Sequence, residues 1–219
     1  MKKQSTKEVK TASQIIQNLR NFNRKERDHL IKFALSESPE HPQISKELWR
    51  AIRPKDGPTR RPKPSEMFIG MDYHLNWLYA ALMVPNDYQN GIYGQENRWP
   101  DSFEVSKKER PLKPNQEDVD LILAFQENDE LYITLIEAKL SSGWGIKQFE
   151  SKFPRLCKLK RLTQPANSFG LTVKWRLMLA SPSKPSAEGP YPDSDLLALS
   201  EGVNLFPTHR QVFLCNNLG

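Results

Sequence analysis

The sequence predicts an α/β protein in which helices flank a mixed central β-sheet. Three observations lead to this fold class. The length of 219 residues suits one main domain with one sizeable core. Strand-like apolar runs occur at 117–125, 131–139 and 171–179. Stretches with helical spacing of apolar residues precede and separate these runs, and such alternation indicates helices packed against a sheet.

Residues 1–64 are predicted to form an N-terminal helical extension that ends in a basic, proline-rich loop. Thr11 can cap a helix whose apolar residues recur at helical spacing up to Phe22. A second amphipathic stretch follows up to Leu35 and is either a solvated surface helix or a phosphate-contacting arm. Residues 53–64 hold four prolines and five basic residues, so they form a loop. That loop either tracks a nucleic-acid backbone or is an ordinary linker.

Residues 65–219 are predicted to form the core domain. Ser65 opens an apolar helix expected over 67–83. Residues 85–116 contain short apolar pieces that suit edge strands and are otherwise unassigned. A helix is expected from 146, and Pro154 must either kink it or restart it. The remaining expectations are a strand at 171–179, a loop at 181–195 and a short strand at 211–215.

The most informative local pattern is a β-hairpin whose arms carry charges. A turn centred between Asn128 and Asp129 sets Asp120 opposite Glu137, with their Cβ atoms roughly 4.5–5.5 Å apart. The same register sets Asp118 opposite Lys139. Two carboxylates at that distance repel each other unless a cation lies between them, which predicts a divalent-metal site with a lysine beside it. The alternative is a hairpin whose ends reach solvent, with Asp118 and Lys139 as a plain salt bridge.

The composition limits the class of partner. The chain has 32 Lys and Arg against 26 Asp and Glu, a net charge of +6 that suits an anionic partner. Its two cysteines, Cys157 and Cys215, have no partners at metal-ligand spacing, so neither a disulfide framework nor a zinc site is indicated. No signal peptide or membrane span is apparent, and we expect a cytoplasmic protein without a membrane partner.

The hairpin, together with the helix after it, resembles the PD-(D/E)xK nuclease superfamily. The resemblance rests on Asp120, on Glu137-Ala138-Lys139 and on Gln148 in the following helix, and covers about residues 66–180. It implies a restriction-endonuclease-like core, in which a helix precedes a β-meander, a second helix crosses over and a further strand joins a mixed sheet. The segments 71–79 and 115–120 are also similar to an uncharacterised bacterial group within the superfamily.

The resemblance implies a role for each motif residue. Asp120 and Glu137 correspond to metal-binding carboxylates, the carbonyl of Ala138 completes the metal shell, and Lys139 is the catalytic lysine. The cofactor implied is Mg²⁺, with Mn²⁺ as a substitute. Gln148 matches a glutamine of exonuclease-like branches, in which a tyrosine usually follows four residues later, where this chain has Lys152.

Asp72 corresponds to an extra acidic metal ligand on the expected first helix, with His74 beside it. The alternative, weighed as equal, is that Asp72 and His74 cap a helix or form hydrogen bonds within the core.

The expected function is therefore metal-dependent hydrolysis of DNA, in a restriction, defence or DNA-processing system. A homodimer is compatible with this function because one metal site cuts one strand. Two alternatives remain: a nuclease-fold relative that binds nucleic acid without cutting it, and a protein-interaction module with an apolar surface patch. The basic residues expected to contact nucleic acid are Arg60, Arg61, Lys147, Lys152, Arg155 and Lys158.

Overall fold

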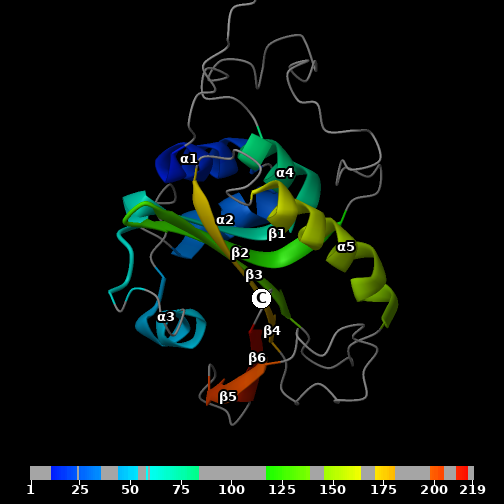
Figure 1. Ribbon diagram of the computed structural model, residues 1–219. Helices are drawn as coiled ribbons and strands as arrows, with labels where there is room; N and C mark the ends of the chain where they lie inside the picture. The colour runs from blue at the N-terminus through cyan, green and yellow to red at the C-terminus, as the bar shows by residue number, and fades with distance from the viewer. Residues whose placement is uncertain are drawn as a thin grey trace, which may run out of the picture.

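A four-stranded mixed sheet forms the centre of the computed structural model (Figure 1). The structure describes residues 11–23, 25–35, 44–53, 58, 60–83, 117–138, 146–163, 171–180, 198–204 and 211–216. The strand order is β1-β2-β3-β4, where β1 is Met67–His74, β2 is Asp118–Glu127, β3 is Glu130–Ala138 and β4 is Thr172–Ala180.

Strands β1, β2 and β3 form an antiparallel meander, and β4 pairs parallel with β3. The parallel pair is joined through helix α5, Ile146–Leu162, because parallel neighbours need a long crossover. Strands β5 (Ala198–Asn204) and β6 (Gln211–Asn216) form a separate antiparallel pair, and β6 lies against β4. The fold class predicted from the sequence is confirmed at this level: a mixed sheet flanked by helices.

Helices cover both faces of the sheet. Helices α1 (Ala12–Phe22), α4 (Leu75–Met83) and α5 pack on one face, in a core that includes Leu19, Leu78 and Leu159. Helix α3 (Lys46–Ile52) packs on the other face through Trp49 and Ile52. Figure 1 shows α1 and α4 above the sheet and α3 below it. We call these two clusters the α5-side core and the α3-side core. Helices α1 and α3 thus belong to the same cores as the sheet.

Helix α2 (Glu26–Leu35) protects the free edge of β1. The backbone N–H of Met71 donates to Asp28 Oδ1 at 2.8 Å, and Lys32 Nζ donates to the carbonyl of Ile69 at 2.5 Å. Asp28 and Lys32 also pair with each other at 2.6 Å. Exposed strand edges pair readily with other chains, so capping by charged side chains stabilises this edge.

The predicted hairpin has the register expected from the sequence. Pairing runs from Leu121–Ile136 to Glu127–Glu130 around the turn at Asn128-Asp129. Asn128 has a φ of 52°, a left-handed conformation that asparagine tolerates. The predicted Thr11 cap is also present, because its hydroxyl accepts from the N–H of Gln14 at 3.2 Å. The strands predicted at 171–179 and 211–215 are β4 and β6.

The prediction of a helix over 67–83 is wrong for the first half of that segment. Residues 67–74 form β1, and only residues 75–83 form a helix, α4. The run is apolar on both sides: Phe68 lies in the α5-side core, whereas Met67 and Ile69 pack in the α3-side core. A strand buried on both faces loses its polar–apolar alternation, so its period cannot be told from that of a buried helix.

The other expectations have mixed outcomes. Helix α5 runs through Pro154 as one element, so the helix does not restart there. The described part of 53–64 holds no helix or strand before the short 3₁₀ turn Pro64–Glu66. Residues 85–116 and 181–195 lie outside the described residues. Over the described part of the chain, no helix is long and apolar enough to cross a membrane.

Candidate metal and phosphate site

Three carboxylates occupy neighbouring positions across the sheet. Residue pairs Met71–Leu121 and Tyr73–Val119 set Asp72 of β1 level with Asp120 of β2. The pair Leu121–Ile136 sets the next position, Asp120, level with Glu137 of β3. We call Asp72, Asp120 and Glu137 the carboxylate row. The hairpin register predicted the second and third members, and the strand β1 adds the first.

Asp72 lies in a strand and not on the helix that was predicted. Its φ is 50°, and the pairing of β1 with β2 omits Asp72 and Asp120. At this position, the alternate side chains of both strands switch from one face of the sheet to the other. Ile69 faces the α3 side but Tyr73, four residues on, lies in the α5-side core, although residues four apart on a regular strand share a face. Leu121 and Val119 differ in the same way. The irregular pair therefore marks a local break in the pleat.

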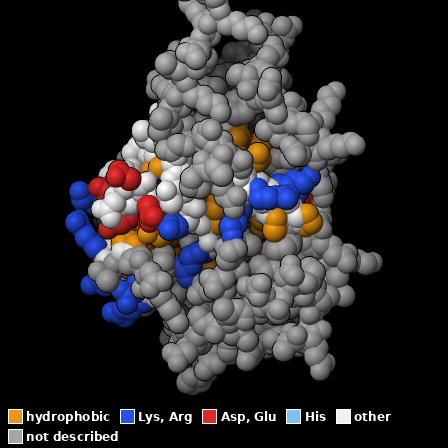
Figure 2. Space-filling view, in the orientation of Figure 1, with side chains coloured by type: hydrophobic (Ala, Val, Ile, Leu, Met, Phe, Trp, Pro, Cys, Tyr) orange, Lys and Arg blue, Asp and Glu red, His pale blue; other side chains and the backbone are white. Residues whose placement is uncertain are grey.

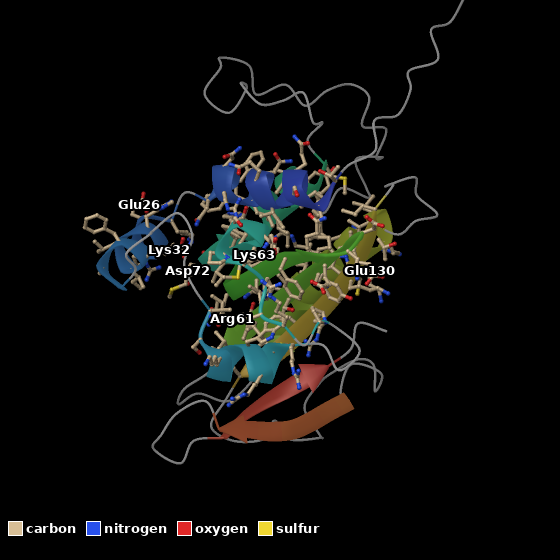
Figure 3. All side chains as sticks on the ribbon, turned by 90° about the vertical axis from the view of Figure 1, so that its left-hand side faces the viewer. Glu26, Lys32, Arg61, Lys63, Asp72 and Glu130 are labelled. Atoms are coloured by element: carbon tan, nitrogen blue, oxygen red, sulfur yellow. The ribbon has the colours of Figure 1, made fainter. Side chains whose placement is uncertain are left out.

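Each carboxylate of the row has its own partner. Asp72 Oδ2 lies 2.9 Å from Arg27 Nη2 of α2, near the exposed edge of the sheet, where Figure 3 shows it beside α2. Asp120 Oδ2 accepts a hydrogen bond of 2.6 Å from the backbone N–H of Ala138.

Glu137 is buried, with 1% of its side chain exposed, and its Oε1 lies 2.7 Å from Lys152 Nζ of α5. Ile133 and Leu135 of the same strand lie in the α5-side core. Every second residue of a strand shares a face, so Glu137 also faces α5. Lys152 itself retains 13% exposure. A charge this deeply buried needs a paired cation, and α5 supplies it.

The donor set of the row suits a hard divalent cation, because Mg²⁺ prefers carboxylate and carbonyl oxygens. As the side chains lie, no three His, Cys, Asp or Glu of the described residues come close enough together to hold a metal. Arg27 and Lys152 neutralise two of the three carboxylates instead. A metal held by Asp120, Glu137, the Ala138 carbonyl and Asp72 would therefore have to replace these two cations.

Three of the predicted site residues fall where the structure gives no side-chain contacts. Lys139 lies outside the described residues, directly after the end of β3 at Ala138. Lys147 and Gln148 lie in the first turn of α5, and their side chains are not among those described. Their predicted roles stay predictions. Asp118, expected opposite Lys139, pairs with Lys25 at 2.6 Å.

Arg155 was predicted to contact nucleic acid, and the structure gives it a structural position. Only 2% of its side chain is exposed. Its Nη1 lies 2.6 Å from Glu117 Oε2, and its Nη2 donates to Asn76 Oδ1. The guanidinium thus joins α5 to α4 and to the start of β2. The other predicted contacts are less enclosed: Lys158 and Arg61 are half-buried, and Arg60 is exposed.

His74 is the residue that precedes α4 and acts as its cap. Its Nδ1 accepts from the backbone N–H of Asn76 at 3.2 Å, which satisfies one of the unpaired donors of the helix start. Burial lowers the pKa of His74, and the nearby positive charges of Arg155 and Lys25 act in the same direction, against the opposing effects of Asp118 and Glu117. The capping role is the alternative weighed from the sequence, and it accounts for His74 without a part in catalysis.

A second charged feature lies on the α3 side of the sheet. A cavity of about 640 Å³ opens between α3 and the proline-rich segment, and its lining includes Arg60 and Arg61, which the sequence had singled out. It also includes Lys46 and Arg50, which sequence reasoning missed, and Arg53, the first residue of the basic loop expected at 53–64. The four-residue spacing of Lys46 and Arg50 was the available signal, because it sets both on one helical face.

No family model, curated protein or solved structure matches this chain. The class of protein supported by the fold is therefore the coarse one, a mixed α/β domain with a four-stranded sheet between helices. Any more specific assignment rests on the residues of the carboxylate row and on the order of the elements around it.

Proposed function

We propose that this chain is a Mg²⁺-dependent nuclease of the PD-(D/E)xK kind that hydrolyses phosphodiester bonds in DNA. The observation that carries the proposal is the carboxylate row, in which three acidic residues far apart in the sequence occupy neighbouring positions on β1, β2 and β3. Arg27 and Lys152 balance two of the three charges, and a metal bound by the row would take over that role.

The order of the elements gives further support. A meander of three strands is followed by the crossover helix α5 and by β4, which pairs parallel with β3. The resemblance implies this order after its first helix. The helix expected in that first place, over 65–83, is a strand followed by α4, and helices α1, α2 and α3 precede the sheet instead. The added helix between β1 and β2 is a departure from the implied pattern.

Each residue of the row, and each lysine near it, has a separate role in the proposed reaction. Asp120 and Glu137 would hold the metal, with the Ala138 carbonyl and Asp72 as further oxygen donors. The metal, when bound, supplies a Lewis acid for the phosphate. Lys152 pairs with Glu137 at 2.7 Å. Released from Glu137, its ammonium would be available to neutralise a phosphate oxygen. Lys139 would orient or deprotonate the attacking water.

The test is a cleavage assay on supercoiled, linear and single-stranded DNA with Mg²⁺ or Mn²⁺ and an EDTA control. Asp120→Asn and Glu137→Gln keep the size of each side chain and an oxygen acceptor, and Lys139→Ala removes the predicted catalytic amine. Each is expected to lower cleavage by on the order of 100-fold or more. Asp129→Asn is the matched control, because Asp129 lies exposed in the turn of the same hairpin. Unchanged cleavage in the row variants would contradict the proposal.

A binding function without cleavage is the second candidate, and the ion pairs favour it. Arg27 and Lys152 already neutralise Asp72 and Glu137, so two of the three carboxylates do not need a metal for neutralisation. This candidate predicts DNA binding in EDTA that weakens as salt rises and no cleavage by any form of the protein. Metal-dependent cleavage that is lost in Asp120→Asn would exclude it.

A protein-interaction function has one observation in its favour. On α2, Leu30 and Phe33 are 66% and 74% exposed, and Ile31 is 39% exposed. Apolar side chains gathered on one exposed helix are typical of contact surfaces. This candidate predicts that Phe33→Ser abolishes binding to a protein partner and leaves DNA cleavage unchanged. Absence of any stable partner in a pull-down with the full chain would count against it.

A further inference from the structure

The cavity beside α3 is strongly basic. Six cationic side chains line it: Lys46, Arg50, Arg53, Arg60, Arg61 and Lys63. No Asp or Glu is among the described residues that line it, and Ile44, Trp49 and Met67 supply apolar parts of the wall. Figure 2 shows Lys and Arg side chains gathered at the lower left, over the region where Figure 1 places α3. We call this cavity the basic pocket.

Three of the cations form a stripe along α3: Lys46 and Arg50 belong to the helix, and Arg53 is the C-cap residue directly after its end at Ile52. Lys46, Arg50 and Arg53 are separated by four and three residues, so they stand one above the other. Basic residues near a helix C-terminus often only complement the helix dipole. That explanation suits Arg50 in the last turn, but it fails for Lys46, which is the first residue of α3 and meets the positive end.

Most of these charges lack a counter-ion in the described chain. Lys63 pairs with Glu66 at 3.3 Å, and Arg61 donates to the carbonyl of Ile44 at 2.6 Å. Among the described residues, no carboxylate lies within salt-bridge distance of the three stripe residues or of Arg60. Within this part of the chain, at least four cations therefore converge on one cavity without neutralisation, which favours a polyanionic ligand.

The wall that carries the stripe is anchored to the sheet. Trp49, 4% exposed, contacts Phe125 of β2 edge to face with ring centroids 5.2 Å apart. Arg176 of β4 donates to the carbonyl of Ile52, the last residue of α3. Figure 3 shows Arg61 close to α3, on the same side. The stripe is thus held in place before a ligand arrives, which lowers the cost of binding.

We propose that the basic pocket binds the phosphodiester backbone of a nucleic-acid strand. The stripe spans about 10 Å, since each helical residue rises about 1.5 Å. Successive phosphates of one strand are further apart than the rise of about 3.4 Å along a duplex axis, so the stripe faces about two phosphates. A single compact phosphate ligand would leave part of the stripe unneutralised. The repeated spacing of the charges is what favours a strand.

This site is distinct from the carboxylate row and does not depend on the proposed nuclease activity. Glu137 of the row pairs with Lys152 on α5, whereas the stripe belongs to α3, which packs on the opposite face of the sheet. The two sites are also separated along β1, because Met67 lines the basic pocket and Asp72 lies five residues further on. Binding at one site can therefore be measured while the other is disabled.

The test measures binding of the full chain to a fluorescein-labelled single-stranded DNA of about 20 nucleotides by anisotropy in EDTA, over a series of salt concentrations. In Arg50→Gln/Arg53→Gln, affinity should fall at least about tenfold, and the salt slope should become shallower by about 1.4, or about 0.7 for each lost phosphate contact. Both side chains are exposed, so the variant should fold, which circular dichroism checks.

Two variants separate the possible outcomes. Lys174→Gln removes an exposed cation from β4 and should change neither affinity nor slope. Because binding is measured in EDTA, a failed cleavage assay leaves this proposal intact. Absence of binding at low salt, or equal binding by Arg50→Gln/Arg53→Gln, would overturn it. Competition by ADP, pyrophosphate or poly-glutamate as strong as by the unlabelled strand would also overturn it, in favour of a small phosphate ligand or an acidic peptide.

Discussion

Replacing Lys152 by methionine tests whether Glu137 is a buried charge that needs a cation. Methionine keeps most of the length of the lysine side chain but removes its ammonium, which lies 2.7 Å from Glu137 Oε1. Removing one partner of a buried ion pair costs about 3–5 kcal/mol, because the other charge stays desolvated. The partial exposure of Lys152 argues for the lower end. We therefore expect Lys152→Met to lower the free energy of unfolding by about 3 kcal/mol.

Urea unfolding at neutral pH measures this cost, and two further variants interpret it. Lys152→Met/Glu137→Gln removes both charges and should recover most of the loss. Lys174→Met breaks a surface pair with Glu130, in which the two side chains are 51% and 34% exposed, and should cost at most about 1 kcal/mol. A cost for Lys152→Met as small as that of Lys174→Met would refute the reasoning.

The same variant connects stability to the proposed metal site. If Glu137 is a metal ligand, Mg²⁺ can take the place of the missing ammonium and should stabilise Lys152→Met more than the wild type. A ligand at 100 times its dissociation constant adds about 2.7 kcal/mol. Ca²⁺-free buffer with EDTA is the reference. An equal effect of Mg²⁺ on Lys152→Met and on Lys152→Met/Glu137→Gln would contradict metal binding by Glu137.

The remaining predictions concern three residues in the framework of the site. His74→Ala removes the cap of α4 and should cost about 1 kcal/mol at neutral pH, and less as His74→Asn. Because burial lowers the pKa of His74 in the folded chain, wild-type stability should fall as pH drops below 6.5, where the unfolded chain binds the proton more readily than the folded chain. Urea unfolding should show a smaller fall in His74→Asn. Gly70→Ala would set a Cβ 2.7 Å from Phe68 Cζ and should cost about 1–3 kcal/mol in thermal unfolding. Arg176→Met leaves the Ile52 carbonyl without its donor and should cost about 1–3 kcal/mol by urea unfolding, with no loss indicating that this contact is dispensable.

The hairpin shows what local sequence can predict. Its two arms have matching apolar runs around an Asn-Asp turn, and the period of two in a strand then sets every pair, including Asp120 level with Glu137. Helix α1, helix α5 and strand β4 were predicted for the same reason, because each has a clear period and a recognisable start. These parts of the candidate site depend on contacts within a short stretch of chain.

Strand β1 shows where local sequence fails. Its residues are covered by α3 on one face and by α1 and α4 on the other, so no polar face marks its period. Only pairing with β2, which begins at Asp118, far along the chain, decides that 67–74 is a strand. That pairing also moves Asp72 from an expected helix to the edge of the carboxylate row.

The sequence by itself determined the elements with a clear period, the hairpin register and the excess of positive charge. The tertiary structure decided which charges meet. Lys152 reaches Glu137 only because α5 crosses back over the sheet. The same crossing places Arg155 of α5 in a buried position against Glu117. Likewise, the stripe on α3 becomes the wall of a cavity only when the proline-rich segment lies beside it. Local patterns depend on neighbours along the chain, whereas ion pairs and cavities depend on distances that the fold sets.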